Sequence, residues 1–274
     1  TYYGNTEFWN GSSWSEVNDM ATGRSESGNS DSSSASSGLV AGGREASPGA
    51  GISTTEEFTQ SSSPVLVEGM LFLSENTTLK GFGKFAGIPA ATWASGGTQN
   101  TGRSNNSGIG TQTAALTVGG SSSPNALVES YNGTSFTEVN DLNTGRELLG
   151  GAGTQTAALA FGGGPGDLVI TESWNGTNWT EVNDLNDARQ ALAGVGTQTS
   201  ALTFGGNTPP RTGNTELWNG TNWTEVNNLN TARNRLAGAG VDNTSALAFG
   251  GSVPPEGAVT EDWNGAAWVE VADL

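Results

Sequence analysis

The sequence predicts an all-β fold made of repeated four-stranded antiparallel units. Its clearest feature is the segment from Trp174 to Leu185, which returns almost unchanged from Trp218 to Leu229. Four arginines mark the same period, since they lie 43, 43 and 44 residues apart: Arg103, Arg146, Arg189 and Arg233. A period of roughly 20–50 residues is typical of an array built from one supersecondary unit. The repeat therefore predicts one array of similar units.

The first two strands of each unit follow its arginine. In one unit a glycine-rich stretch, Ala191 to Gly196, precedes a second run, Ser200 to Phe204, that ends at Gly205 and Gly206. Short runs of β-forming residues bounded by Gly and Asn clusters are typical of strands. Because its side chains are small, we expect the first strand to lie at the crowded inner end of the unit.

The third and fourth strands carry aromatic residues and form a predicted hairpin. Thr215 to Trp218 and Trp223 to Val226 flank the dipeptide Asn219-Gly220. Asn-Gly between two strands predicts a type I′ turn, in which both central residues have positive φ. Four strands cannot bury both faces alone, so we expect the units to stack radially as blades of a β-propeller, with the aromatics between neighbouring blades.

The number of blades depends on the first third of the chain. The chain starts with the third and fourth strands of a unit, within Thr6 to Trp14, and five full units follow. The first interval exceeds the 43-residue repeat by 36 residues, which contain two strand-like runs, 69–73 and 79–82. If this hairpin completes the half unit, the propeller has six blades, which we favour. Five or seven blades, or a protruding hairpin, are the alternatives. We predict a single domain over 1–274, with the insertion at about 59–92.

The residues that recur also resemble a known family. A glycine pair that closes the second strand, two aromatic residues and an arginine that opens the next unit resemble the kelch repeat: Gly205, Gly206, Trp218, Trp223 and Arg233. This resemblance implies a kelch-like β-propeller. Gly153 to Leu159 and Trp174 to Trp179 also resemble kelch-like repeats in tail-fibre and other virion proteins of marine phages. That resemblance implies a virion or extracellular location.

Composition and charge exclude several classes of function. The net charge is −17, which repels phosphate backbones and anionic membranes, so we expect neither a nucleic-acid partner nor membrane insertion. The chain has no His and no Cys, which removes the commonest general bases and nucleophile partners. A carboxylate-dependent glycosidase is the less favoured alternative, because most acids recur in register and look structural. We therefore predict that the protein is not an enzyme.

Two sets of recurring polar residues could form binding sites, but a structural role is favoured for both. A ring of arginines could hold an anion, although such residues more often pair with a neighbouring acid and with loop carbonyls. Carboxylate and amide oxygens after the fourth strand could hold Ca²⁺, whereas an Asx turn is the simpler interpretation. These are the segments that end at Asp141, Asp184 and Asn228. We expect no metal and no cofactor, with Ca²⁺ as the alternative.

The loops between the second and third strands differ from unit to unit, and loops on a rigid scaffold are where binding usually occurs. The candidate ligand-binding residues in these loops are Arg44, Glu45, Asp167, Arg211 and Glu256. We therefore predict a non-enzymatic adhesion module that presents its loops to a surface glycan or a protein receptor. The alternative is a purely structural assembly protein, whose partners are other virion proteins or copies of itself.

Overall fold

The computed structural model describes residues 5–9, 14–25, 27–29, 37–44, 51, 53–59, 71–74, 78–81, 92–121, 125–253 and 257–273. These residues hold 24 strands, which confirms the predicted all-β class. No helix within them is long and apolar enough to cross a membrane.

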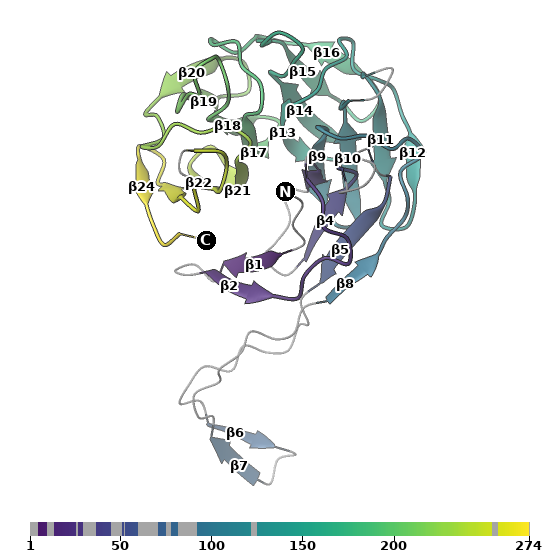
Figure 1. Cartoon of the computed structure of the whole chain (residues 1–274), viewed down its shortest axis with the longest axis vertical. Coiled ribbons are helices and arrows are strands. Elements are labelled where there is room, and N and C mark those ends of the chain that lie inside the picture. Colours follow the sequence, from purple (N-terminus) through teal and green to yellow (C-terminus); the bar gives the residue numbers. More distant parts are fainter. Residues whose placement is uncertain are drawn as a thin grey trace.

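Most strands belong to five four-stranded antiparallel sheets, which are arranged around one axis as the blades of a β-propeller (Figure 1). Blade 1 consists of β3 (Gly28–Asn29), β4 (Ser37–Ala41), β5 (Thr55–Thr59) and β8 (Thr92–Ser95). Blade 2 consists of β9 (Ser107–Thr111), β10 (Ala114–Val118), β11 (Val128–Tyr131) and β12 (Phe136–Glu138). Blade 3 consists of β13 (Gly150–Thr154), β14 (Ala157–Phe161), β15 (Thr171–Trp174) and β16 (Trp179–Glu181).

The last two complete blades follow the same order. Blade 4 consists of β17 (Ala193–Thr197), β18 (Ser200–Phe204), β19 (Thr215–Trp218) and β20 (Trp223–Val226). Blade 5 consists of β21 (Ala237–Asp242), β22 (Ser245–Phe249), β23 (Thr260–Trp263) and β24 (Trp268–Glu270). The described residues thus form five complete blades. The sequence analysis favoured six blades and gave five as an alternative.

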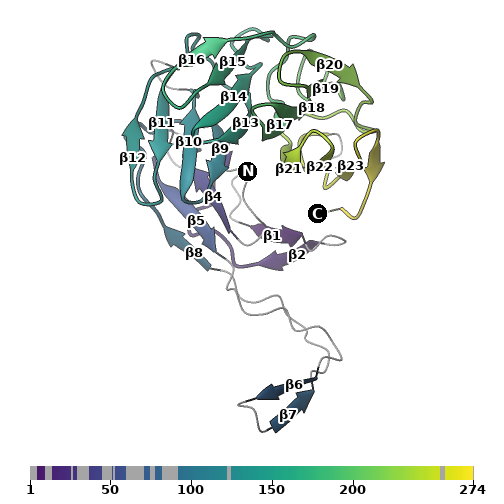
Figure 2. The ribbon, with the colours of Figure 1, turned by 180° about the vertical axis from the view of Figure 1, so that it is seen from behind.

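Four strands stand outside these blades. β1 (Thr6–Trp9) pairs with β2 (Trp14–Val17), and we call this two-stranded sheet the half-blade. It lies in the ring between blade 5 and blade 1 (Figure 1). β6 (Leu71–Ser74) pairs with β7 (Thr78–Gly81), as the predicted hairpin. In the described pairing, however, β6 and β7 form a sheet of their own and do not complete the half-blade (Figure 2).

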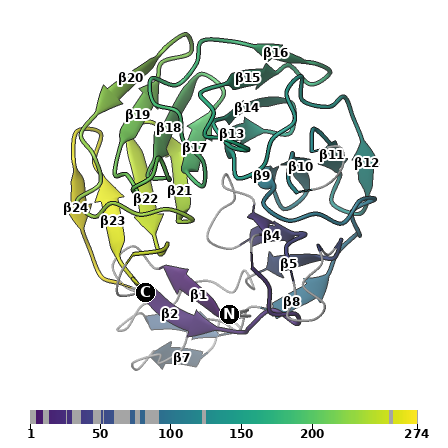
Figure 3. The same cartoon turned by 45° about the horizontal axis from the view of Figure 1, so that its top comes forward.

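The innermost strands lie too close together for side chains at several positions. β13, β17 and β21 lie nearest the axis (Figure 3). A Cβ atom added to Gly151 would come within 2.7 Å of Ile109 Cδ1 on β9, and one on Gly238 within 2.7 Å of Phe204 Cζ. At such distances the neighbouring side chain would have to shift before a larger residue could fit. The glycine-rich first strand is therefore the inner strand, as predicted.

The hydrophobic core lies between neighbouring blades. Phe161 of blade 3 meets Trp223 of blade 4 with ring centroids 4.9 Å apart, and Phe204 of blade 4 meets Trp268 of blade 5 at 4.8 Å. Trp174 and Trp179 pack into a buried cluster with Ile109 and other residues of blade 2. The prediction that aromatics fill the gaps between blades is confirmed.

The type I′ turn predicted from Asn-Gly is wrong. Gly220 has a φ of 91°, but Asn219 is not among the residues with positive φ. The loop spans four residues between the paired Trp218 and Trp223. Asn219 Oδ1 accepts hydrogen bonds of 2.9 Å from the backbone N–H groups of both Thr221 and Asn222. The asparagine side chain, and not its backbone angle, organises this turn.

Candidate functional site

The recurring arginines and a recurring glutamate form buried ion pairs within each blade. Arg146 Nη1 lies 2.7 Å from Glu172 Oε1, and neither side chain is exposed. Glu172 also accepts hydrogen bonds from the backbone N–H and the amide of Asn143, both at 2.8 Å. Burial lowers the pKa of Arg146, and the charge of Glu172 opposes that shift. The other pairs are Arg24–Glu56, Arg103–Glu129, Arg189–Glu216 and Arg233–Glu261.

These pairs confirm the structural role predicted for the arginines. Their backbones also join neighbouring blades, because the N–H of Gly163 in blade 3 donates a 2.9 Å hydrogen bond to the carbonyl of Arg189. The glycine pair is required at this junction, since a Cβ on Gly162 would lie 2.8 Å from the same carbonyl oxygen. The arginines are thus part of the scaffold.

The acidic residues after the fourth strand also act within the scaffold. Asp184 Oδ1 accepts a hydrogen bond of 3.1 Å from the N–H of Thr171, at the start of the third strand. Asn228 Oδ1 accepts the equivalent bond from Thr215, also at 3.1 Å. Both side chains offer the same acceptor atom, which explains why Asn can replace Asp here. In the described residues no group of three or more Asp or Glu could hold a metal ion.

A ring of four equivalent residues surrounds the axis at one end of the propeller. They lie two positions after the arginines and have positive φ values between 54° and 57°: Asn105, Leu148, Ala191 and Arg235. The N–H groups of the last three each donate to the carbonyl of the preceding member, at 2.9 Å from Leu148, 2.8 Å from Ala191 and 2.9 Å from Arg235. We call these residues the inner ring. Identical backbone geometry thus presents four different side chains.

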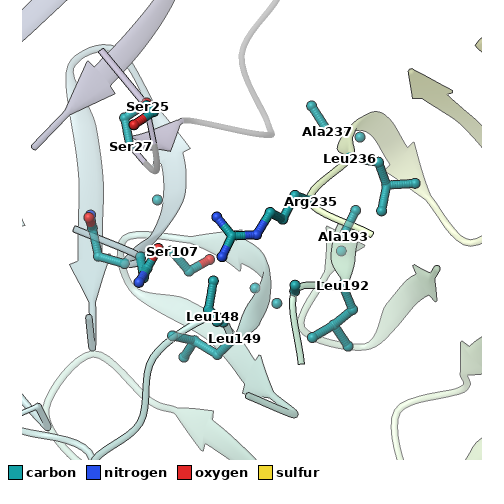
Figure 4. Close-up of a pocket in the computed structure, with 18 of the residues that line it drawn as sticks. Ser25, Ser27, Ser107, Leu148, Leu149, Leu192, Ala193, Arg235, Leu236 and Ala237 are labelled. Carbon is teal, nitrogen blue, oxygen red and sulfur yellow. The ribbon is translucent and has the colours of Figure 1, made fainter. Parts of the chain in front are cut away.

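The inner ring lines a cavity of about 810 Å³ on the propeller axis (Figure 4). Its wall is polar at blades 1 and 2, where Ser25, Ser27, Asn105, Asn106 and Ser107 contribute. Its wall is apolar at blades 3 and 4, where Leu148, Leu149, Ala191 and Leu192 contribute. The Arg235 side chain extends from blade 5 into the cavity (Figure 4). The cavity therefore offers hydrogen-bonding groups, an apolar surface and the guanidinium of Arg235.

Asn106 departs from the repeat in a way that bears on binding. Its equivalents in blades 3, 4 and 5 are Leu149, Leu192 and Leu236, which are buried. Asn106 is only 6% exposed, and neither atom of its amide has a hydrogen-bond partner among the described residues. Buried polar groups are nearly always hydrogen-bonded. Asn106 therefore places an unsatisfied buried amide beside the cavity.

The predicted loop residues that the structure describes, Arg44, Asp167 and Arg211, do not line this cavity. Arg44 is exposed and forms isolated β-bridges with Ser25 and Gly51. Asp167 accepts a 2.9 Å hydrogen bond from Gln190 Nε2. Arg211 Nη2 donates a 3.2 Å bond to Ser252 Oγ. Asp167 and Arg211 thus connect their loops to the next blade, whereas Glu45 and Glu256 lie outside the described residues.

These loops nevertheless lie beside the inner ring. Isolated bridges join Gln190, next to Ala191, to Asn207 of the blade 4 loop, and join Asn234, next to Arg235, to Ser252 of the blade 5 loop. The inner ring and Asn106 were not among the predicted site residues. Alignment of the units on their arginines would have found them, because the second position after each arginine differs between blades and the third is asparagine at 106 where three other blades have leucine.

No protein-family model and no curated protein matches this sequence.

Proposed function

We propose that this protein is a non-enzymatic binding module that holds a surface glycan in the cavity at the inner ring. One observation carries the proposal: Asn106 is a buried amide without a hydrogen-bond partner among the described residues, at a position where three other blades have leucine. The recurring acids, by contrast, are engaged in the scaffold, as Glu172 is with Arg146. Residues that break the repeat are therefore the ones available for recognition.

The chemistry of the cavity suits a sugar. Hydroxyl groups of a glycan both donate and accept hydrogen bonds, as do the amide of Asn106 and the hydroxyl of Ser107. The apolar face of a pyranose ring fits against side chains such as Leu148. Arg235 has an exposed side chain whose planar guanidinium matches a carboxylate. We therefore expect a glycan with a carboxylate to bind more tightly than its neutral analogue.

The setting that we propose is a virion or another extracellular surface, where the module serves adhesion. The kelch-like repeat pattern, and its likeness to repeats in tail-fibre and virion proteins of marine phages, supports this setting. The variable loops beside the inner ring could add contacts to a larger receptor, and Asp167 and Arg211 are the described loop residues proposed for this role. The charge of −17 disfavours nucleic acid as a partner.

The test is a glycan array followed by calorimetric titration of the hits. Asn106→Leu installs the residue of the other blades, so the fold should tolerate it, and we expect at least a tenfold loss of affinity. Arg235→Ala should weaken carboxylated glycans and leave neutral ones within twofold. Arg211→Ala is the control outside the cavity and should leave the binding of both classes of glycan unchanged, since the role proposed for Arg211 is contact with a larger receptor.

Three results would contradict the proposal. An array without any saturable binding would remove the glycan. Loss of affinity in Arg211→Ala but not in Asn106→Leu would move recognition from the cavity to the loops, as for a protein receptor. Release of a hydrolysed sugar during the titration would show an enzyme.

A second candidate function, assembly with another protein, is favoured by a different observation. Among the strands that the structure describes, β1 pairs with β2 alone, whereas the third strand of each complete blade pairs on both sides.

A further inference from the structure

Two buried amides replace two leucines at the junction between blades 1 and 2. In the three following junctions a leucine stands four residues before the arginine and another three residues after it. Each pair belongs to one hydrophobic cluster: Leu142 and Leu149, Leu185 and Leu192, and Leu229 and Leu236. At Arg103 the same two positions are Gln99 and Asn106, which are buried with exposed fractions of 3% and 6%. The junction thus keeps the burial of the leucine pair but not its apolar character.

The two amides face the same point of blade 1. A Cβ added to Gly42, which follows β4, would lie 2.9 Å from Gln99 Oε1 and 3.4 Å from Asn106 Oδ1. At the equivalent Gly162, such an atom would lie 3.1 Å and 3.2 Å from the two methyl groups of Leu192. The amides of Gln99 and Asn106 therefore converge at a place where another junction has leucine methyl groups.

Neither amide is satisfied within the part of the chain that the structure describes. The side-chain oxygen and nitrogen of Gln99 and of Asn106 have no hydrogen-bond partner there. Buried polar groups are nearly always hydrogen-bonded, and a group left without a partner lowers stability. Leucine at both positions avoids this loss in three other junctions. The amide pair is therefore best explained by a ligand that supplies the partners.

The amide pair continues the polar wall of the cavity into the junction. The N–H of Gln99 donates a 2.8 Å hydrogen bond to the carbonyl of Ser53 in blade 1. The N–H of the next residue, Asn100, donates a 2.7 Å hydrogen bond to Glu129 Oε2 in blade 2. These bonds hold the backbone of Gln99 between the two blades. Asn106 lines the cavity, whereas Gln99 does not.

We propose that Gln99 and Asn106 form a subsite for the acetamido group of an N-acetylated sugar. This inference rests on the proposed function, because it names a group of the glycan that the cavity would hold. An acetamido group carries its acceptor and its donor on separate atoms of one planar unit. One side-chain amide donates to its carbonyl oxygen while the other accepts from its N–H. A carboxylate offers acceptors only, and a hydroxyl presents donor and acceptor at a single oxygen, so neither engages both amides in this way.

The acetamido group reaches the pair as the side chains turn towards the cavity. The amide atoms are shielded from solvent in this arrangement, but Asn106 borders the cavity. The terminal torsion of asparagine has broad preferences, so its amide turns at little cost. Arg235 extends into the same cavity from blade 5 (Figure 4). The expected ligand therefore carries an acetamido group for the amide pair and a carboxylate for Arg235.

Matched pairs of sugars test the subsite by calorimetric titration. The probes are the methyl glycosides of glucose and N-acetylglucosamine, and those of glucuronic acid and its 2-acetamido analogue. We expect the acetylated member of each pair to bind at least tenfold more tightly. Gln99→Leu should remove this preference and leave the affinity for the other member within twofold. Because Gln99 does not line the cavity, a general change in the cavity wall would not give this result.

Gln190→Leu is the matched control. Gln190 precedes Ala191 of the inner ring, but its amide donates a 2.9 Å hydrogen bond to Asp167. The variant should leave the preference for the acetylated sugars within twofold. Gln99→Leu combined with Asn106→Leu restores the leucine pair of the other junctions, so the midpoint of urea unfolding should rise. A lower midpoint would show that the amides serve the fold, and would overturn the proposal.

Separate outcomes distinguish failure of the subsite from failure of the proposed function. Equal affinity for sugars with and without the acetamido group would overturn the subsite and leave the proposed function in place. If no glycan binds, N-methylacetamide replaces the sugars and the side-chain NH₂ signals of Gln99 and Asn106 are followed by NMR. Saturable shifts of both signals would support the subsite. Signals that do not move would assign the pair to enclosed water and overturn it.

Discussion

Glu172 accepts a hydrogen bond from Arg146 at 2.7 Å, and neither side chain reaches solvent. A charge left unpaired in such a place is costly, because removal of one partner of a buried ion pair destabilises proteins by about 3–5 kcal/mol. We therefore expect Glu172→Gln to lower the free energy of unfolding by that amount, as measured by urea denaturation. Glu181→Gln removes an exposed carboxylate on the adjacent strand and should change it by less than about 0.5 kcal/mol.

Replacing both residues of the ion pair by apolar residues separates the contribution of charge to stability from that of packing. Arg146→Met combined with Glu172→Leu should destabilise the protein less than either single change, because no buried charge is then left without a partner. Additive losses in the double variant would contradict this account.

The contact between Trp14 and Phe249, whose ring centroids lie 5.1 Å apart, predicts that the half-blade is seated in the ring. Aromatic pairs of this geometry contribute about 0.5–1.5 kcal/mol beyond the area that they bury. A double-mutant cycle with Trp14→Ala and Phe249→Ala should give a coupling energy in that range. The cycle for Trp268 and Phe204, whose rings lie 4.8 Å apart, is the control taken from complete blades. A coupling of zero at Trp14 alone would show that the half-blade does not hold this place in solution.

The blades could be predicted from the sequence because their requirements are local and repeated. Gly151 must be glycine because the inner strands lie close together there, and Trp223 must be aromatic because it packs between blades. Each of these requirements recurs in every repeat of the sequence. The blade count could not be predicted in the same way. It depends on whether the β6–β7 hairpin pairs with the half-blade. This pairing joins segments far apart in the sequence, so the repeat pattern does not reveal it.

The site was only partly predictable for a related reason. Variable loops were chosen because they differ in length, whereas Asn106 and Arg235 differ from their equivalents in side chain only, on a backbone that repeats. At Asn219 the sequence predicted the hairpin but not the conformation of its turn. Asn-Gly correctly indicated a hairpin, but the side-chain hydrogen bonds of Asn219 selected a four-residue loop over the type I′ geometry.

Tyr131 allows the interface between blades 1 and 2 to be tested by pH. It occupies the position of Trp174 and Trp218 and donates a hydrogen bond to Glu57 of blade 1. Burial, and then the hydrogen bond to Glu57, raises the pKa of Tyr131 to about 12. In the unfolded chain a tyrosine ionises near about 10. Between those values the unfolded state therefore loses its proton first, so the stability present below pH 10 should decrease as the pH rises towards 12.

Absorbance of the phenolate measures this directly. The chain has three tyrosines, and we expect one of them to ionise late, with a midpoint near pH 12. Tyr131→Phe should remove that late transition and leave the other two unchanged. It should also remove the part of the stability loss between pH 10 and 12 that comes from this phenol. Ionisation of all three tyrosines together near about pH 10, with the protein still folded, would show that Tyr131 is not held against Glu57.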